Sequence, residues 1–145
     1  MNVFLLSHSR RLKTDETDSK IIGIYSSLTN VQKTIEEFKN IVGFKDYPND
    51  FCIEEFEIIT LDNKSIFSNN TVFFLQHEHS VGEYDYVTKI GMFFSYKDAK
   101  KYMDNLKENV SLQEQYDIVY SIGEFSIDRY IVDKNYWTEG FIECI

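Results

Sequence analysis

Apolar and polar positions along this chain form short strand-like runs, interrupted by stripes with helical spacing. Residues 3–7 and 21–25 are rich in β-forming residues and bounded by polar ones, which predicts two strands. Apolar residues then recur every three or four positions, at Val31, Ile35, Phe38 and Val42. This stripe predicts a one-faced helix that begins after Thr29 or Asn30 and is ended by Gly43.

The second half of the chain repeats the order of segments found in the first half. The corresponding pairs are residues 3–8 and 72–77, 20–27 and 89–95, 29–39 and 97–107, and 51–56 and 125–130. A second helical stripe, opened by Ser95 or Asp98, consists of Ala99, Tyr102, Met103, Leu106 and Val110. Similar segments in the same order indicate an internal duplication, with a longer connection before the last strand of the second copy.

The third strand of each copy, expected over residues 51–59 and 125–132, changes its alternation phase midway. Phe51 and Ile53 lie in one phase, and Phe56 lies in the other. A β-bulge in the middle of the strand would turn both sets toward the core, and burial on both faces would do the same. The pattern leaves these two explanations open.

These segments predict an α+β fold with two ββαβ repeats, an antiparallel sheet and two main helices. One copy of about 65 residues offers a marginal core, so we expect the copies to pack as a single pseudo-symmetric domain. Repeat one is expected over residues 1–61, a polar linker over 62–70, and repeat two with its C-terminal tail over 71–145.

Charge narrows the possible partners. The chain has 15 basic and 24 acidic side chains, for a formal net charge of −9. Binding to a phosphate backbone needs a basic face, so nucleic acid is not an expected partner. Residues 71–145 hold 13 of the acidic side chains and 7 of the basic ones, so this half is better suited to a cationic protein, although acidity also serves solubility alone.

Several absences shape the expected location and chemistry. No apolar run approaches the ~20 residues of a membrane span, and the sequence opens without the pattern of a secretory signal, so we expect a cytoplasmic protein without a membrane partner. Cys52 is expected to be a small buried side chain, with no disulfide to Cys144. No phosphate loop, nucleophile motif or metal motif is present, so we expect no enzyme activity, cofactor or metal.

The three histidines are His8, His77 and His79. His8 and His77 occupy corresponding places at the end of a first strand, where a hydrogen bond to backbone is the simplest role. His77 and His79 would lie on the same side of a strand, which leaves open an adventitious metal site.

Exposed acidic and aromatic side chains on the first loop of each copy favour a protein-binding surface. The candidates on these loops are Asp15, Glu16, Asp18, Glu83, Tyr84, Asp85 and Tyr86. Glu55 and Glu57 are expected on one side of a strand, where two like charges repel unless a cation or a basic partner approaches. Trp137 is either a plug in the core or a binding anchor.

Several motifs stand out along the chain: VFLLSHS, DETDSK, IIGIYSS, GFKDYP, FCIEEFEI and DKNYWTEGF. Together they resemble a family of short uncharacterised bacterial domains, in which one module runs from the first strand to a Trp-Thr-Glu-Gly-Phe tail. Here the early motifs stand in copy one and the tail stands at residues 133–141 in copy two. Copy one lacks the Trp, and copy two lacks GFKDYP.

The resemblance implies a small acidic immunity protein, of the kind encoded beside bacterial toxins. On this hypothesis the chain is a monomer or weak dimer that binds a cognate toxin, expected to be a basic nuclease, and occludes its active site. Carboxylates would stand in for substrate phosphates and speed the encounter. The alternative is a non-catalytic module that binds a small ligand between the two copies.

Overall fold

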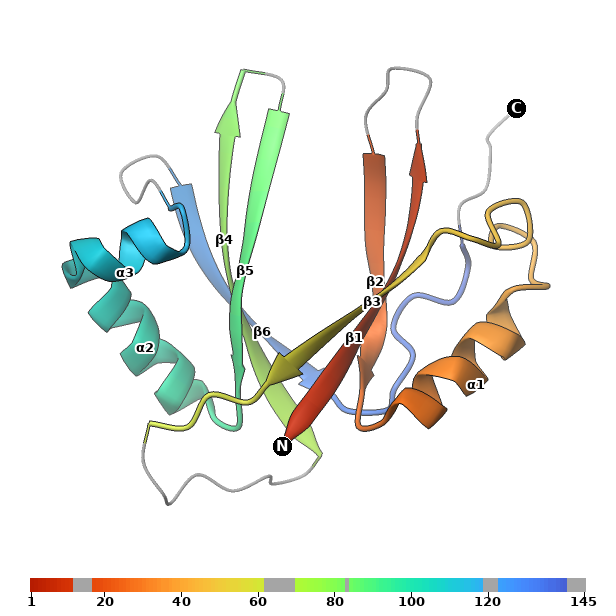
Figure 1. The fold of residues 1–145 in the computed structure, drawn as a ribbon, viewed down its shortest axis with the longest axis horizontal. Coiled ribbons are helices and arrows are strands. Elements are labelled where there is room, and N and C mark those ends of the chain that lie inside the picture. Colours follow the sequence, from red (N-terminus) through yellow and green to blue (C-terminus); the bar gives the residue numbers. More distant parts are fainter. Residues whose placement is uncertain (12–16, 62–69, 83, 119–122, 141–145) are drawn as a thin grey trace. The chain divides into compact units, whose positions relative to one another are not determined.

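The computed structural model describes residues 1–11, 17–61, 70–82, 84–118 and 123–140 (Figure 1). It is an α+β protein with two antiparallel three-stranded sheets and, within the described residues, three helices. The elements of the first half are β1 (Asn2–Arg11), β2 (Thr17–Tyr25), α1 (Leu28–Phe38) and β3 (Phe51–Glu57). Those of the second half are β4 (Thr71–Val81), β5 (Tyr84–Phe93), α2 (Tyr96–Glu108), α3 (Val110–Gln115) and β6 (Gly123–Ile131).

The chain divides into two compact units whose boundaries differ from those of the expected repeats. Unit 1 consists of Met1–Phe56 together with Val132–Ile145, and unit 2 is Glu57–Ile131. The end of the second half therefore belongs to the unit built by the first half. Each unit holds one sheet with α1 or α2 packed on one face.

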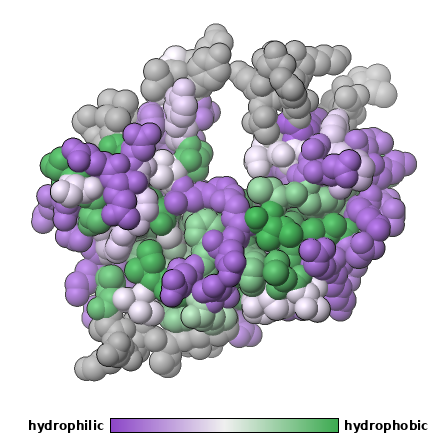
Figure 2. Space-filling view, in the orientation of Figure 1, coloured by the Kyte–Doolittle hydropathy of each residue, from purple (hydrophilic) through white to green (hydrophobic). Residues whose placement is uncertain are grey.

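The sheet of unit 1 has the strand order β2-β1-β3. α1 begins where the Ser27 hydroxyl accepts a hydrogen bond of 3.2 Å from the Asn30 backbone N–H. Its apolar stripe packs on the sheet, and the core includes Leu6, Ile22, Tyr25, Val31, Phe38 and Phe44. Exposed polar residues on the other side of α1 give this part of the surface its hydrophilic character (Figure 2).

The sheet of unit 2 has the strand order β5-β4-β6. α2 is capped by Ser95, whose hydroxyl accepts a hydrogen bond of 3.1 Å from the Asp98 backbone N–H. Buried residues of the core cluster are Leu75, Ile90, Phe93, Ala99, Met103, Leu106 and Ile118. Both sheets have a register shift in the first hairpin, between Leu6 and Ser7 and between Leu75 and Gln76.

The helices differ from the sequence prediction at their ends. α1 begins at Leu28, directly after the Ser27 cap, rather than after Thr29 or Asn30. It ends before Val42, which is 61% exposed in the following turn, and Val110 is 65% exposed at the start of α3. Helical spacing therefore extended both stripes too far, because the chain turns away from the sheet before these residues.

In β6, the change of alternation phase results from burial on both faces of the strand. Its register with β4 runs without a shift from Thr71↔Ile131 to His79↔Gly123, so there is no bulge in this pairing. Phe125 and Ile127 pack on the helix side. Tyr130 lies on the other face, with its ring 6.5 Å from that of Phe74.

Two further expectations are corrected by the strands. Cys52 is exposed rather than buried, because it alternates with the partly buried Phe51 and Ile53 on β3. The first hairpins are longer than expected, and Asp18, Tyr84, Asp85 and Tyr86 lie within strands rather than loops. None of the helices in the described ranges has the length and apolar character to cross a membrane.

Candidate functional site

In the sheet of unit 2, α2 packs on one face. The other face is polar and acidic near the end of β4 and the starts of β5 and β6. Alternation along β4, β5 and β6 places these residues on it: Gln76, Glu78, Ser80, Asp85, Val87, Lys89, Glu124, Ser126 and Asp128. We call these residues the acidic sheet face. The carboxylates of Glu78, Asp85, Glu124 and Asp128 belong to exposed residues. Among the described residues of this face, four are acidic and one, Lys89, is basic.

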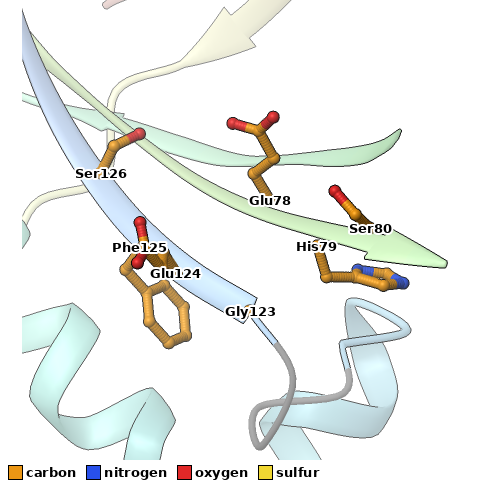
Figure 3. A pocket seen from close by; sticks show the side chains of 7 residues that line it. All are labelled: Glu78, His79, Ser80, Gly123, Glu124, Phe125 and Ser126. Carbon is orange, nitrogen blue, oxygen red and sulfur yellow. The ribbon is translucent and has the colours of Figure 1, made fainter. Parts of the chain in front are cut away.

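Glu78 and Glu124 lie directly opposite each other on neighbouring antiparallel strands. Like charges in such a pair repel, so this position lowers the stability of the sheet and favours the approach of a cation. A cavity of about 480 Å³ opens beside the pair and is lined by both glutamates, His79, Ser80, Gly123, Phe125 and Ser126 (Figure 3). In this view Glu78 and Ser126 point to one side of the sheet, and the rings of His79 and Phe125 point to the other.

Two histidines of β4 lie on the other face of the sheet, the one on which α2 packs. The rings of His77 and His79 have their centroids 5.8 Å apart, and His79 stacks on Tyr86 at 5.2 Å. His77 is fully buried against Phe125, with ring centroids 4.7 Å apart. Burial lowers the pKa of the His77 imidazole below its usual 6.5, and the neighbouring His79 lowers it further.

The histidine prediction is confirmed for His8 and wrong for His77. His8 Nε2 donates a hydrogen bond of 2.8 Å to the Tyr47 carbonyl oxygen. Neither ring nitrogen of His77 has a hydrogen-bond partner in the described part of the chain. Burial of an imidazole without hydrogen-bond partners favours its neutral form and lowers stability.

A metal centre finds little support in the described ranges. They contain no group of three or more His, Cys, Asp or Glu side chains that could hold a metal ion. His77 and His79 lie close together, and no third side chain of this kind joins them within the part of the chain that the structure describes. A cation at this end of the sheet would therefore be bound mainly by charge and water, as expected for a weak site.

The loop residues predicted to bind a partner are only partly described. Asp15, Glu16 and Glu83 lie outside the described residues. Asp18 lies in β2 and Tyr84 in β5. Asp85 is exposed on the acidic sheet face and accepts a hydrogen bond from Ser80, and Tyr86 is 50% exposed on the other side of β5.

Glu55, Glu57 and Trp137 are not among the residues of the acidic sheet face, since the two glutamates are in β3 and Trp137 belongs to unit 1. Glu55 and Glu57 are exposed on β3, and Glu55 accepts a hydrogen bond of 2.6 Å from the Asn2 side chain. Trp137 is partly buried against the core of unit 1, with its ring 5.2 Å from that of Phe44. Its surroundings favour the role of a core plug.

Sequence reasoning missed Glu78, Glu124 and Asp128. A signal for them was present, because Glu78 alternates with His77 and His79, and the other two alternate with the apolar Phe125 and Ile127. What was missing was the pairing of β4 with β6, which joins residues 46 positions apart in the sequence. Period-two patterning gives the face of a strand and does not give its neighbour.

Comparison with known proteins finds one family that is similar to part of this chain. Residues 1–66 match the family model described as a domain of unknown function, DUF7336. The match covers β1, β2, α1 and β3 and supports a relation of this part of the chain to an uncharacterised domain family. No curated protein and no solved structure matches the chain.

Proposed function

We propose that this chain is an immunity-type protein that binds a basic protein partner through the acidic sheet face. The observation that carries the proposal is the direct opposition of Glu78 and Glu124, on a sheet face that also holds Asp85 and Asp128. A basic surface such as that of a nuclease toxin would relieve this repulsion on binding. The protein then acts by occupying the surface that the partner uses for its substrate, and it needs no chemistry of its own.

Two exposed side chains near the start of β5 offer apolar contact to such a partner. Val87 is 53% exposed on the acidic sheet face, and Tyr86 is 50% exposed on the other side of the strand. Charge speeds the encounter, and buried apolar or aromatic groups slow dissociation. The combination of carboxylates with Tyr86 and Val87 therefore suits a protein partner better than a small anion or a nucleic acid.

The test is the association rate with a partner obtained by co-purification, beginning with the product of the neighbouring gene. The double variant Glu78→Lys, Glu124→Lys is expected to lower the association rate constant about 10- to 100-fold at low salt and to weaken its dependence on salt. Glu36→Lys, Glu37→Lys makes the same charge change on the exposed side of α1. Equal effects of the two double variants would mean that net charge alone acts, and no effect would move the binding site elsewhere.

The cavity beside Glu78 favours a second candidate function, the binding of a small cationic ligand. Its volume of about 480 Å³ lies within the range of small-molecule sites. A thermal-shift screen with divalent metal ions and with polyamines tests this candidate, because a ligand at 100 times its Kd stabilises the folded state by about 2.7 kcal/mol. An unchanged melting temperature with every probe would leave protein binding as the proposal.

We also propose that the two halves of the chain arose by duplication of one ββαβ module. Support comes from matching details of the two hairpins, in which Gly23 pairs with Leu6 and Gly91 pairs with Leu75, each beside the register shift. The strand orders β2-β1-β3 and β5-β4-β6 also correspond. In addition, a serine is the N-cap of both α1 and α2.

A further inference from the structure

Two backbone hydrogen bonds in this protein are formed by corresponding residues of the two halves. The Ile59 N–H donates to the Met92 carbonyl at 2.9 Å, within unit 2. The Asp133 N–H donates to the Ile24 carbonyl at 2.8 Å, within unit 1. Ile59 and Asp133 hold the same place after their third strands, eight residues beyond Phe51 and Phe125 respectively.

The acceptors correspond as closely as the donors. Ile24 and Met92 each follow the glycine that pairs with a buried leucine of the first strand. The residues before the donors are also equivalent, since Ile58 and Val132 are both 6% exposed. Each half of the chain therefore supplies its post-strand segment to the sheet of the other half. The exchange is reciprocal.

We infer that the outer edge of the second strand, at Ile24 in β2 and Met92 in β5, is a docking site for the segment that follows the third strand of another copy of this module. The partner at this edge is thus a second copy, and the present chain is two exchanged copies joined covalently. This inference rests on the proposed duplication and is independent of any partner at the acidic sheet face. It uses strand addition, in which backbone groups on a sheet edge pair with an extended segment.

The segment docked in unit 1 is held by more than one hydrogen bond. The Asp133 carboxylate accepts hydrogen bonds from the Ser26 N–H at 2.9 Å, the Ser26 hydroxyl at 2.7 Å and the Asn30 side chain at 3.1 Å. The Tyr136 N–H donates to the Ile22 carbonyl at 2.7 Å.

Beyond the hydrogen bonds, the tail inserts into the region of the GFKDYP motif. Trp137 packs on Phe44, and a Cβ on Gly140 would lie 2.5 Å from the carbonyl carbon of Gly43. The tail motif of the second half thus fits the GFKDYP motif of the first half. This pairing gives the split of the two motifs between the halves a physical reason, because each half retains the part that the exchange requires.

The docked segment in unit 2 is shorter and depends on close packing. A Cβ on Gly91 would lie 2.5 Å from Ile59 Cδ1, so the glycine makes room for the incoming side chain. Ile59 also forms a parallel bridge with Phe93 and packs against the core cluster. The missing Cβ of Gly91 leaves room at this edge for an aliphatic side chain of the docked segment.

The first experiment cuts the full-length protein between the halves. A specific protease site is inserted between Ser65 and Ile66, in the linker expected from sequence, and the cut protein is analysed by size-exclusion chromatography and native mass spectrometry. We expect fragments 1–65 and 66–145, apart from the inserted residues, to remain a 1:1 complex at micromolar concentration. Fragments that elute separately would overturn the inference. No toxin or other partner is needed, so this result does not depend on the proposed function.

A second measurement separates exchange from simple adhesion of the fragments. Asp133→Ala is expected to raise the Kd between the cut fragments about tenfold, because it removes a carboxylate that accepts three hydrogen bonds. Asp128→Ala, which removes an exposed carboxylate of β6, is the matched control and should leave the Kd within about twofold. Equal effects of the two variants would overturn the inference.

A disulfide tests the docking at the edge of β5 directly. In a background with Cys52→Ser and Cys144→Ser, the pair Ile59→Cys, Gly91→Cys removes the side chain that fills the glycine site and brings two thiols together there. Oxidation should link the two cut fragments covalently on a non-reducing gel. The control pair Glu78→Cys, Glu124→Cys lies within one fragment and should form a bond without linking the two. A control disulfide without a link between the fragments would overturn the exchange.

Discussion

At the scale of single residues, two glycines share a backbone conformation and differ in their surroundings. Gly82 and Gly140 have φ angles of 64° and 71°, in the left-handed region. A Cβ on Gly82 would meet nothing within 4 Å, whereas on Gly140 it would lie 2.5 Å from the Gly43 backbone. We expect Gly82→Ala to lower the free energy of unfolding by about 1 kcal/mol and Gly140→Ala by about 3 kcal/mol or more, measured by urea unfolding. Equal losses would mean that the tail does not pack as described.

The buried imidazole of His77 should make the free energy of unfolding fall in mild acid. Its pKa is lowered in the folded state, so well above pH 6.5 the imidazole is neutral in both states and its titration does not change stability. As the pH falls below 6.5, the unfolded chain takes up a proton that the folded chain resists, and the free energy of unfolding declines. The melting temperature of the wild type should therefore drop more between pH 7.5 and pH 5.5 than that of His77→Gln. Parallel curves would assign the pH dependence to other groups.

The burial of some single residues could be predicted from the sequence. Val31, Phe38 and Leu106 are buried as their helical stripes indicate. Cys52 and Val42 are exposed, since the first faces away from the core on an alternating strand and the second lies beyond the end of its helix. Residue type alone favours burial of both, so only the position of the element around them decides the outcome.

At the scale of elements, the two main helices depend on equivalent serine caps. The hydroxyls of Ser27 and Ser95 each accept a hydrogen bond from the backbone N–H three residues later. We expect Ser27→Ala and Ser95→Ala to lower the free energy of unfolding by about 1 kcal/mol each. Ser111→Ala, at an exposed position of α3, is the control and should change it by less than about 0.5 kcal/mol. A loss confined to one cap would show that the two helices contribute unequally.

The existence and order of the main elements were predictable, and their limits were not. The strands and two long helices follow the alternating and helical patterns expected for residues 3–7, 21–25, 72–77 and the two stripes. The hairpin strands extend further, because pairing between polar strand ends continues well past the apolar segments. The short helix α3 falls in the longer connection of the second half, where no apolar stripe announced it.

At the scale of the whole molecule, the C-terminal segment belongs to the unit formed by the N-terminus. Removal of residues 132–145 takes away the donors to Ile22 and Ile24 and the Trp137 ring. Hydrogen–deuterium exchange of the β1 and β2 amides should then become at least about tenfold faster, while β4 and β5 change less, because their own pairing is retained. Faster exchange confined to β4 and β5 would contradict the division into units.

Some features of the candidate site could be predicted from the sequence, and others depend on the order of the strands. Acidity of the second half and the exposed positions of Asp85 and Tyr86 could be inferred from composition and pattern. The opposition of Glu78 and Glu124 could not, since it depends on which strand lies beside β4. The chain's own alternation set the face on which each carboxylate lies, and the strand order set which carboxylates meet.

The sequence by itself determined the α+β composition, the repeated order of segments and the apolar faces of α1 and α2, because these follow from local periodicity that neighbours along the chain share. Only the tertiary structure decided that Ile59 pairs with Met92 and Asp133 with Ile24. Those bonds join residues distant in sequence through backbone groups, which every residue carries except for the N–H that proline lacks. No pattern of side chains encodes such a choice of partner, so it becomes visible only when the strands are placed.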